Sequence, residues 1–167
     1  FSSGDARYNS LALDSAGRPY VVYTDGANGY HATVMKYESG DWVTVGAAGF
    51  SLGSAYKPSV AFDSSDRPYV TYMDGANGNK VTVMKYDGSN WETLGTAGFS
   101  AGNINYPSLA LDSSGTPFVA YMDGANGNKI TVMKYDGSDW VTIGVAGFSA
   151  GAGYYSSLAI DSSDTPY

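Results

Sequence analysis

Hydrophobic and polar residues alternate in short runs along the chain, and turn-forming residues end each run. Residues 99–147 show this pattern best, and there we expect four strands. The predicted strands are residues 108–112, about 117–122, 130–135 and 140–144. No segment keeps the 3.6-residue period of an amphipathic helix over a useful length. The pattern therefore predicts an all-β protein built from short antiparallel strands.

The residues between the runs are those that tight turns prefer. Residues 123–127 read Asp-Gly-Ala-Asn-Gly, and we expect the Asn126-Gly127 pair to supply the positive φ of a tight hairpin. The first predicted strand of each unit ends in an aspartate followed by a serine, a pattern typical of an Asx-type turn cap. These capping residues are Asp14, Asp63, Asp112 and Asp161.

One phrase recurs at a spacing of 49 residues, beginning at Phe1, Phe50, Phe99 and Phe148. The repeats are 1–49, 50–98, 99–147 and a partial fourth, 148–167, which holds the first strand and the start of the second. Four antiparallel strands in about 50 residues are typical of a β-propeller blade. A β-sandwich does not need such copies, and β-solenoid repeats are usually shorter. The sequence therefore predicts a β-propeller of four-stranded antiparallel blades.

The number of repeats leaves the propeller ring incomplete. The chain holds about 3.4 blades, whereas propellers close with roughly 4–8. Closure therefore requires more chain or oligomerisation. We expect a piece of a longer protein. The alternative is a homo-oligomer, since an open stack of blades exposes apolar edges and unpaired strand backbone.

Composition narrows the possible partners. The net charge is −7 and the nine Lys and Arg residues are scattered, so no basic stripe is available for nucleic acid. No apolar run approaches the roughly 20 residues of a spanning helix, and we expect no membrane insertion. The absence of cysteine excludes disulfides and thiolate chemistry.

Residue patterns that support catalysis are also missing. Neither Gly-x-Ser-x-Gly nor His-Glu-x-x-His occurs. The single histidine, His31, aligns with Lys80 and Lys129, which favours a structural role. The acidic loops do not have the alternating oxygens and distal glutamate of a calcium loop. We therefore expect no catalytic residue, no metal site and no cofactor.

Candidate ligand-binding residues gather on one predicted face, where the Asp-Gly-Ala-Asn-Gly loops and the connections between repeats lie. Aromatic rings there can stack on pyranose faces, while amides and carboxylates bind hydroxyl groups. The candidates are Tyr8, Tyr56, Tyr106, Tyr155, Asp25, Asn28, Asp74, Asn77, Asp123 and Asn126. The alternative is structural: the aspartates accept bonds within their own turns, the asparagines supply φ, and the tyrosines pack between blades. The tryptophans Trp42, Trp91 and Trp140 are expected to cover the outer core of a blade, with ligand contact as the alternative.

Several phrases of the third repeat resemble those of known proteins. Leu-Ala-Leu-Asp-Ser-Ser-Gly-Thr-Pro, Met-Lys-Tyr-Asp-Gly-Ser-Asp-Trp and Gly-Phe-Ser-Ala-Gly look like blade repeats of large, mostly bacterial, surface or secreted β-propeller proteins. Residues 136–140 are also similar to the Asp-box of sialidases, but they are shorter and lack its leading serine, and an Asp-box is a structural hairpin. The near-identical blades are similar to those of propeller lectins such as tachylectins and bacterial fucose-binding lectins. That resemblance implies an extracellular or cell-surface protein with several equal sugar sites, one per blade gap.

Three functions compete on these grounds. The first is a non-enzymatic module that binds glycans at grooves between blades and gains strength from multivalency. The second is a structural or protein-interaction scaffold of a surface or filament-forming protein, whose partners are other protein chains. The third is a glycosidase, which needs a carboxylate pair that is not repeated in every unit. The sequence offers no such pair.

Overall fold

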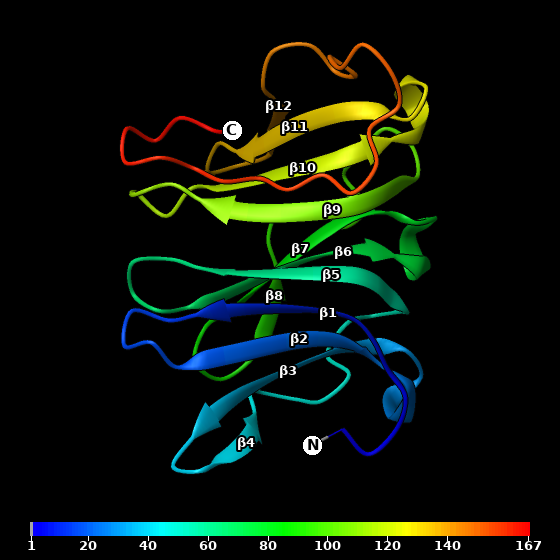
Figure 1. Cartoon of the computed structure of the whole chain (residues 1–167). Helices are drawn as coiled ribbons and strands as arrows, with labels where there is room; N and C mark the ends of the chain where they lie inside the picture. Colours follow the sequence, from blue (N-terminus) through cyan, green and yellow to red (C-terminus); the bar gives the residue numbers. More distant parts are fainter. Residues whose placement is uncertain (1) are drawn as a thin grey trace.

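The computed structural model describes residues 2–167 and consists of three four-stranded antiparallel sheets followed by a partial fourth unit (Figure 1). The first sheet contains β1 (Ala6–Leu13), β2 (Pro19–Asp25), β3 (His31–Glu38) and β4 (Asp41–Thr44). The second contains β5 (Ala55–Phe62), β6 (Pro68–Asp74), β7 (Lys80–Tyr86) and β8 (Trp91–Thr93). The third contains β9 (Ile104–Leu111), β10 (Pro117–Asp123), β11 (Lys129–Tyr135) and β12 (Trp140–Thr142). The prediction of an all-β protein with repeated four-stranded sheets is confirmed. Phe1 lies outside the described residues.

Each sheet is a blade whose strands follow one another in sequence order. The first strands, β1, β5 and β9, lie side by side at the front of Figure 1, and the chain after β12 returns along β9. Residues 148–167 form no named strand, but Ile160 and Pro166 make an antiparallel bridge. The fourth unit thus follows the course of a first strand and turns back, without the neighbouring strands that complete a blade.

Helical structure in residues 2–167 is limited to three short 3₁₀ turns. These are η1 (Gly26–Asn28), η2 (Gly75–Asn77) and η3 (Gly124–Asn126), each between the second and third strands of a blade. None of these turns is long enough to cross a membrane.

Two of the strand boundaries predicted for the third blade differ from the structure by more than one residue, and the larger difference is in its first strand. That strand begins at Ile104, four residues before the predicted start at residue 108. Tyr106 and Pro107 interrupt the alternation there because they form a β-bulge in the structure. The fourth strand is also shorter than predicted, ending at Thr142.

The tryptophans that open the fourth strands fasten each blade to the one before it. The Trp91 ring stacks on Phe50 with 4.1 Å between ring centroids, and its Nε1 donates to the carbonyl oxygen of Val45 at 2.9 Å. Trp140 makes the same two contacts with Phe99 and with the carbonyl oxygen of Leu94. The expectation that these indoles cover the outer core is therefore confirmed for Trp91 and Trp140.

Blades also pack face to face through small apolar side chains. One buried cluster joins Val22 and Val34 of the first blade to Val60, Val70 and Tyr72 of the second. An equivalent cluster joins the second and third blades. Because each blade buries its apolar face only against its neighbours, stability is shared along the stack.

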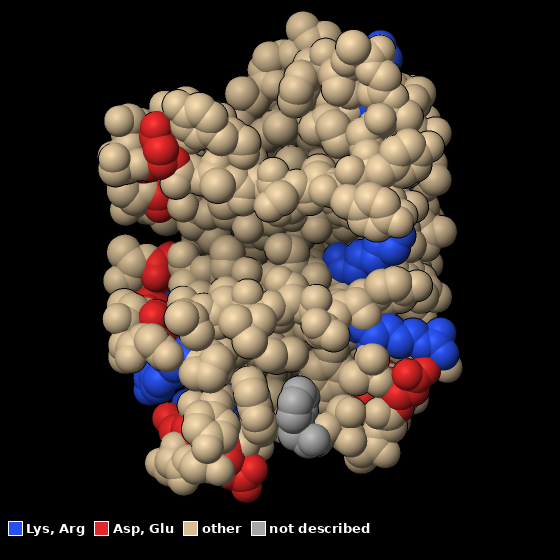
Figure 2. Space-filling model, in the orientation of Figure 1, with Lys and Arg blue, Asp and Glu red and all other residues tan. Residues whose placement is uncertain are grey.

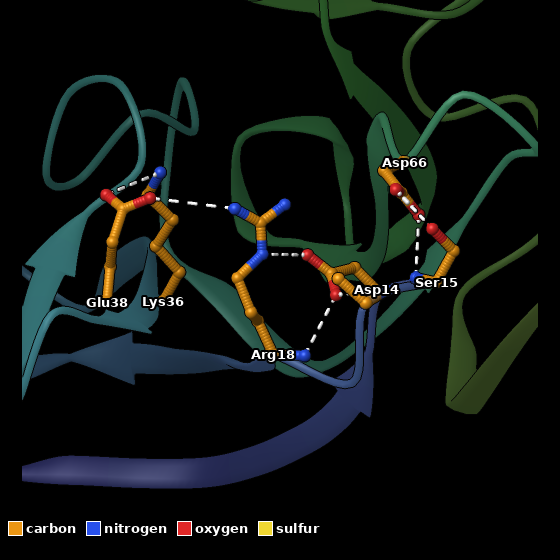
Figure 3. A network of polar contacts seen from close by, with 7 residues as sticks. Asp14, Ser15, Arg18, Lys36, Glu38 and Asp66 are labelled. Atoms are coloured by element: carbon orange, nitrogen blue, oxygen red, sulfur yellow. Dashed lines mark hydrogen bonds and ion pairs between the residues drawn. The ribbon is translucent and has the colours of Figure 1, made fainter.

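The turn between the first and second strands is held by the predicted aspartate cap. Asp14 Oδ1 accepts from the backbone N–H groups of Ala16, at 3.0 Å, and Arg18, at 2.9 Å. Asp14 Oδ2 pairs with Arg18 Nε at 2.6 Å, and that guanidinium also approaches Glu38 (Figure 3). Asp63, Asp112 and Asp161 cap their own turns in the same way. The Asx-cap prediction is confirmed.

A two-bond latch joins some of these turns across blades. The carboxylate of Asp66 accepts from the backbone N–H and the hydroxyl of Ser15, at 2.8 and 2.6 Å (Figure 3). Ser113 and Asp164 repeat this latch at 2.7 and 2.8 Å. Between the second and third blades, glycine occurs at the position equivalent to Asp66 and Asp164. This residue, Gly115, has no side chain to form the latch.

Candidate functional site

A β-bulge interrupts the first strand of every blade near its beginning. In β1 the register of pairing with β2 shifts between Arg7 and Ser10. Tyr8 and Asn9 therefore lie opposite a single residue, Tyr23. β5 and β9 carry the same shift at equivalent positions. The bulges re-aim the side chains of their first residues.

The first residue of each bulge adopts a left-handed backbone conformation. Its φ is 50° at Tyr8, 51° at Lys57, 49° at Tyr106 and 56° at the equivalent Tyr155. This conformation costs a residue with a Cβ roughly 1–2 kcal/mol, whereas glycine adopts it freely. No repeat has glycine at this position. Large side chains are thus kept here against backbone strain, as is common at functional sites.

These four side chains line one groove along the first strands of the blades. Its volume is about 530 Å³, and the other lining residues are the serines, the prolines and Asn9 that follow the bulge positions. In Figure 2 the middle of the face over these strands is largely uncharged, and most charged side chains lie toward its two sides. The residues that line the groove include no carboxylate, although the chain as a whole is acidic.

The bulge side chains form a row in which each contacts the next. Lys57 Nζ lies 3.8 Å from the ring centroid of Tyr106 and 5.9 Å from that of Tyr8. The rings of Tyr106 and Tyr155 are 4.3 Å apart between centroids and tilted by 48°. Tyr106 therefore positions both Lys57 and Tyr155. The predicted packing of these tyrosines between blades is present, and it leaves ring surface uncovered in the groove.

The ends of the row are the open aromatic surfaces. Tyr155 is 77% exposed and Tyr8 is 48% exposed. The hydrogen bond of Tyr155 with Tyr106, followed by the effect of the neighbouring charge on Tyr106, raises the pKa of Tyr155. A tyrosine hydroxyl, with an ordinary pKa of about 10, is protonated at neutral pH in any case and can donate a hydrogen bond.

The serines at the base of the groove connect neighbouring blades. Ser108 Oγ accepts from the backbone N–H of Leu158 at 3.0 Å, and Ser156 Oγ donates to the carbonyl oxygen of Tyr106 at 2.7 Å. Ser10 and Ser59 accept longer bonds from the next blade in the same manner. These bonds fix the spacing of the bulges from blade to blade.

The predicted aspartates lie away from this groove and are engaged inside their blades. Asp25 is 3% exposed, and its Oδ1 accepts from the backbone N–H of Ala27 at 3.0 Å. Its Oδ2 accepts from Asn28 Nδ2 at 2.9 Å and from Thr33 Oγ1 at 2.8 Å. The same network surrounds the buried carboxylates of the next two blades, with Asp74 bound by Asn77 and Asp123 by Asn126. Ligand contact by these residues stays a prediction, and we rest no proposal on it.

The turn that these residues form differs from the predicted hairpin. Asn126 lies inside the 3₁₀ turn and donates to Asp123, so it is not there to supply positive φ. The left-handed residues are the next two, Gly127 with φ of 67° and Asn128 with φ of 61°. The aspartate cap converts the expected two-residue turn into a longer, hydrogen-bonded one.

One predicted tyrosine lies beside the bulge position, not on it. Tyr56 precedes Lys57 and is not among the residues that line the groove. Sequence reasoning chose it for its ring and missed Lys57. The 49-residue spacing aligns Lys57 with Tyr8, Tyr106 and Tyr155, and this register was the signal that could have identified it.

Other candidate chemistry is not assembled in the described chain. Within residues 2–167 no three His, Asp or Glu side chains group closely enough to hold a metal ion. His31 Nδ1 lies 2.6 Å from the backbone oxygen of Ser51, which accounts for the side chain by a local contact. The groove is therefore the main candidate site.

Comparison with known proteins shows which solved structures this chain is similar to. No protein-family model matches the sequence, and no curated protein matches it. Among solved structures, the chain is similar to a fucose lectin from Kordia zhangzhouensis in complex with methyl-fucoside, with a TM-score of 0.54 and 19% identity over 83% of this chain and 99% of that one. It is also similar to the Aleuria aurantia lectin, with a TM-score of 0.55 and 16% identity over 85% of this chain and 50% of that one.

Propeller enzymes show the same likeness. An ulvan lyase matches with a TM-score of 0.61 and 16% identity, over 86% of this chain and 40% of that one. The chain thus spans nearly all of the Kordia lectin and half or less of the other two proteins. At such identities the similarity shows the fold, and both lectins and enzymes use it. The chain is an all-β protein of repeated four-stranded blades that matches part of the β-propeller fold.

Proposed function

We propose that this chain is a non-enzymatic carbohydrate-binding module and that the groove along its first strands is the binding site. One observation carries the proposal: tyrosine side chains line a single groove from the same left-handed backbone position in three repeats. The likeness to two lectins supports it at the level of the fold. We also propose an extracellular or cell-surface location, where such glycans are found.

The groove offers the two kinds of contact that sugars require. The exposed rings of Tyr8 and Tyr155 present apolar faces on which a pyranose can stack. The Asn9 amide and the tyrosine hydroxyls can donate to and accept from ring hydroxyls. Since the bulge position recurs from repeat to repeat along the groove, several weak contacts on one molecule would act together on a branched or repeating glycan.

The composition of the groove supports binding without catalysis. Hydrolysis of a glycosidic bond uses two carboxyl groups on either side of that bond. The residues that line the groove include none. The repeated aspartates, which are the nearest alternative, are buried in their own hydrogen-bond networks.

A glycan array followed by calorimetric titration tests this function. We compare the wild-type chain with Tyr155→Ala, with Tyr155→Phe, and with Tyr167→Ala as a control at an exposed tyrosine outside the groove. Loss of a stacking ring worth about 1.4 kcal/mol weakens binding about tenfold. We expect that loss for Tyr155→Ala only. Absence of glycan binding by the wild-type chain, or equal loss in the control, would refute the proposal.

A protein-interaction scaffold is the second candidate, and one surface favours it. Leu11 and Leu13 of β1 are 61% and 57% exposed, whereas Val60 and Leu109, the equivalents of Leu11 in β5 and β9, are buried against the preceding blade. An apolar face of this kind suits another blade or another protein chain. Light scattering during size exclusion tests this candidate, because a discrete oligomer that binds no glycan would favour the scaffold.

A further inference from the structure

The row of bulge residues contains one charged member. Tyrosine occupies the position in the first, third and fourth repeats, but lysine occupies it in the second. Lys57 has the same left-handed φ as the tyrosines and lies in the same groove between Tyr8 and Tyr106. The four positions thus share one backbone conformation, but the second carries a charged side chain where the others carry an aromatic ring.

The surroundings hold the Lys57 ammonium group in the groove. Its Nζ donates to Asn105 Oδ1 at 2.5 Å and lies over the face of the Tyr106 ring. An amide oxygen and an aromatic face orient a cation without neutralising its charge. An ammonium group has three N–H donors, so donors remain after the bond to Asn105.

Four of the other cations, Arg18 among them, are paired with carboxylates, whereas Lys80, Lys85, Lys129 and Lys134 have no carboxylate within 4.0 Å among the described residues. Arg7 pairs with Asp5, Arg67 with Asp63, and Lys36 with Glu38. Lys57 has no carboxylate oxygen within 4.0 Å among the described residues, and the groove lining contains none. Among the residues that line the groove Lys57 is the only cation, so the candidate sugar site carries a positive charge that no carboxylate compensates. Such a charge favours an anionic ligand group, because charge-assisted hydrogen bonds are the stronger ones.

We propose that the groove prefers acidic saccharides, with the carboxylate or sulfate group of the sugar bound to Lys57 Nζ and the sugar ring against Tyr8 or Tyr155. This inference rests on the proposed function and names its ligand class. The groove volume of about 530 Å³ is within the range of small-ligand sites. The second repeat then sets the specificity, and the other repeats supply aromatic contact.

Titration calorimetry with matched sugars tests the preference. Methyl β-glucuronide differs from methyl β-glucoside only by its carboxylate. Glucose 6-sulfate carries a sulfate group, so comparing it with the glucuronide shows which of the two anionic groups the groove binds. We expect the wild-type chain to bind at least one anionic sugar about tenfold more tightly than methyl β-glucoside, since a hydrogen bond to a charged group is worth about 1.5 kcal/mol or more. Raising the salt concentration should reduce this difference, because the pair is partly exposed.

Two variants locate the effect. Lys57→Tyr installs the residue of the other repeats and should abolish the preference while methyl β-glucoside still binds. Lys57→Gln removes the charge with a smaller change of shape and should do the same. Lys134→Gln removes an equal charge from an exposed position of β11 outside the groove and should leave the preference unchanged.

The outcomes separate this inference from the proposed function. Equal affinity of the wild-type chain for the neutral and anionic sugars would overturn the preference alone. A preference that survives both Lys57 variants, or that Lys134→Gln also abolishes, would overturn the role of Lys57. Failure to bind any saccharide would overturn the proposed function together with the inference.

Discussion

Replacing Asp74 by asparagine should destabilise the chain far more than its small change of shape implies. The Asp74 carboxylate is fully buried. Its Oδ1 accepts from the backbone N–H of Ala76 at 3.0 Å, and its Oδ2 accepts from Asn77 Nδ2 at 2.9 Å and Thr82 Oγ1 at 2.7 Å. An asparagine can keep its amide oxygen at the Oδ2 position, where it still accepts from Asn77 and Thr82, but its amide N–H₂ group then faces the backbone N–H of Ala76.

The expected magnitude follows from the one bond that is lost and from the lost charge on the acceptor of the other two. Thr82 Oγ1 already accepts from the backbone N–H of Gly98 at 2.9 Å, so its own proton must go to the carboxylate. One hydrogen bond to a charged group is worth about 1.5 kcal/mol or more and the other two bonds lose their charge assistance, so Asp74→Asn should lower the free energy of unfolding by about 2 kcal/mol. That is a large share of the stability of a small domain.

Urea unfolding followed by tryptophan fluorescence measures this loss. Asp139→Asn is the matched control, because Asp139 is exposed and its Oδ1 accepts only a backbone bond, from Trp140, that asparagine can also accept. The control should change the free energy of unfolding by less than about 0.5 kcal/mol. If Asp74→Asn falls within the same margin, the buried network does not stabilise the blade and our interpretation of the repeated aspartates is wrong.

Four further substitutions test other contacts of the chain. Trp91→Phe keeps the stacked ring but loses its hydrogen bond to the preceding blade, and should lower the urea midpoint through a loss of about 1–2 kcal/mol; an unchanged midpoint would contradict this. Ser15→Ala should cost about 1 kcal/mol. Asp66→Gly removes both latch bonds, worth about 2 kcal/mol together, but relieves a φ of 58° worth about 1–2 kcal/mol, so its net cost in the same assay should be no more than about 1 kcal/mol; a cost of about 2 kcal/mol or more would show that the strain is unimportant. The backbone N–H of Asp139 lowers the pKa of Asp136 below its ordinary 3.8, so this carboxylate stabilises the fold above pH 3.8 and the effect is lost as the pH falls through the lower folded value. As the pH is lowered below 3.8, the urea midpoint of Asp136→Asn should therefore fall less steeply than the midpoint of the wild type.

The sequence predicts the fold well because the fold depends on local periodicity. Strand alternation, turn residues and the 49-residue spacing each report on neighbouring residues, and together they predict four-stranded repeated sheets. The start of β9 was missed for a physical reason. At Tyr106 and Pro107 a bulge adds one residue to the strand, so side chains that belong to one strand no longer alternate along the sequence.

The site was harder to predict because its parts come together across blades. Tyr8, Tyr106 and Tyr155 were named from residue type, and the structure brings them into one groove with Lys57. The importance of Lys57 depends on Asn105 and Tyr106, which are some 50 residues away in sequence. The role of the aspartates, by contrast, is local. The alternative that they bond within their own turns matches their contacts in the structure.

The latch between turns gives the stack an uneven mechanical strength. Ser15 holds Asp66 across the first seam between blades, and Ser113 holds Asp164 across the third, but Gly115 leaves the second seam without this bond. A linear array separates where the coupling between neighbours is weakest. Of the two seams between complete blades, the second thus depends on the bond from Lys57 to Asn105 where the first has the latch, so under partial denaturation a Lys57 variant should part between its second and third blades first.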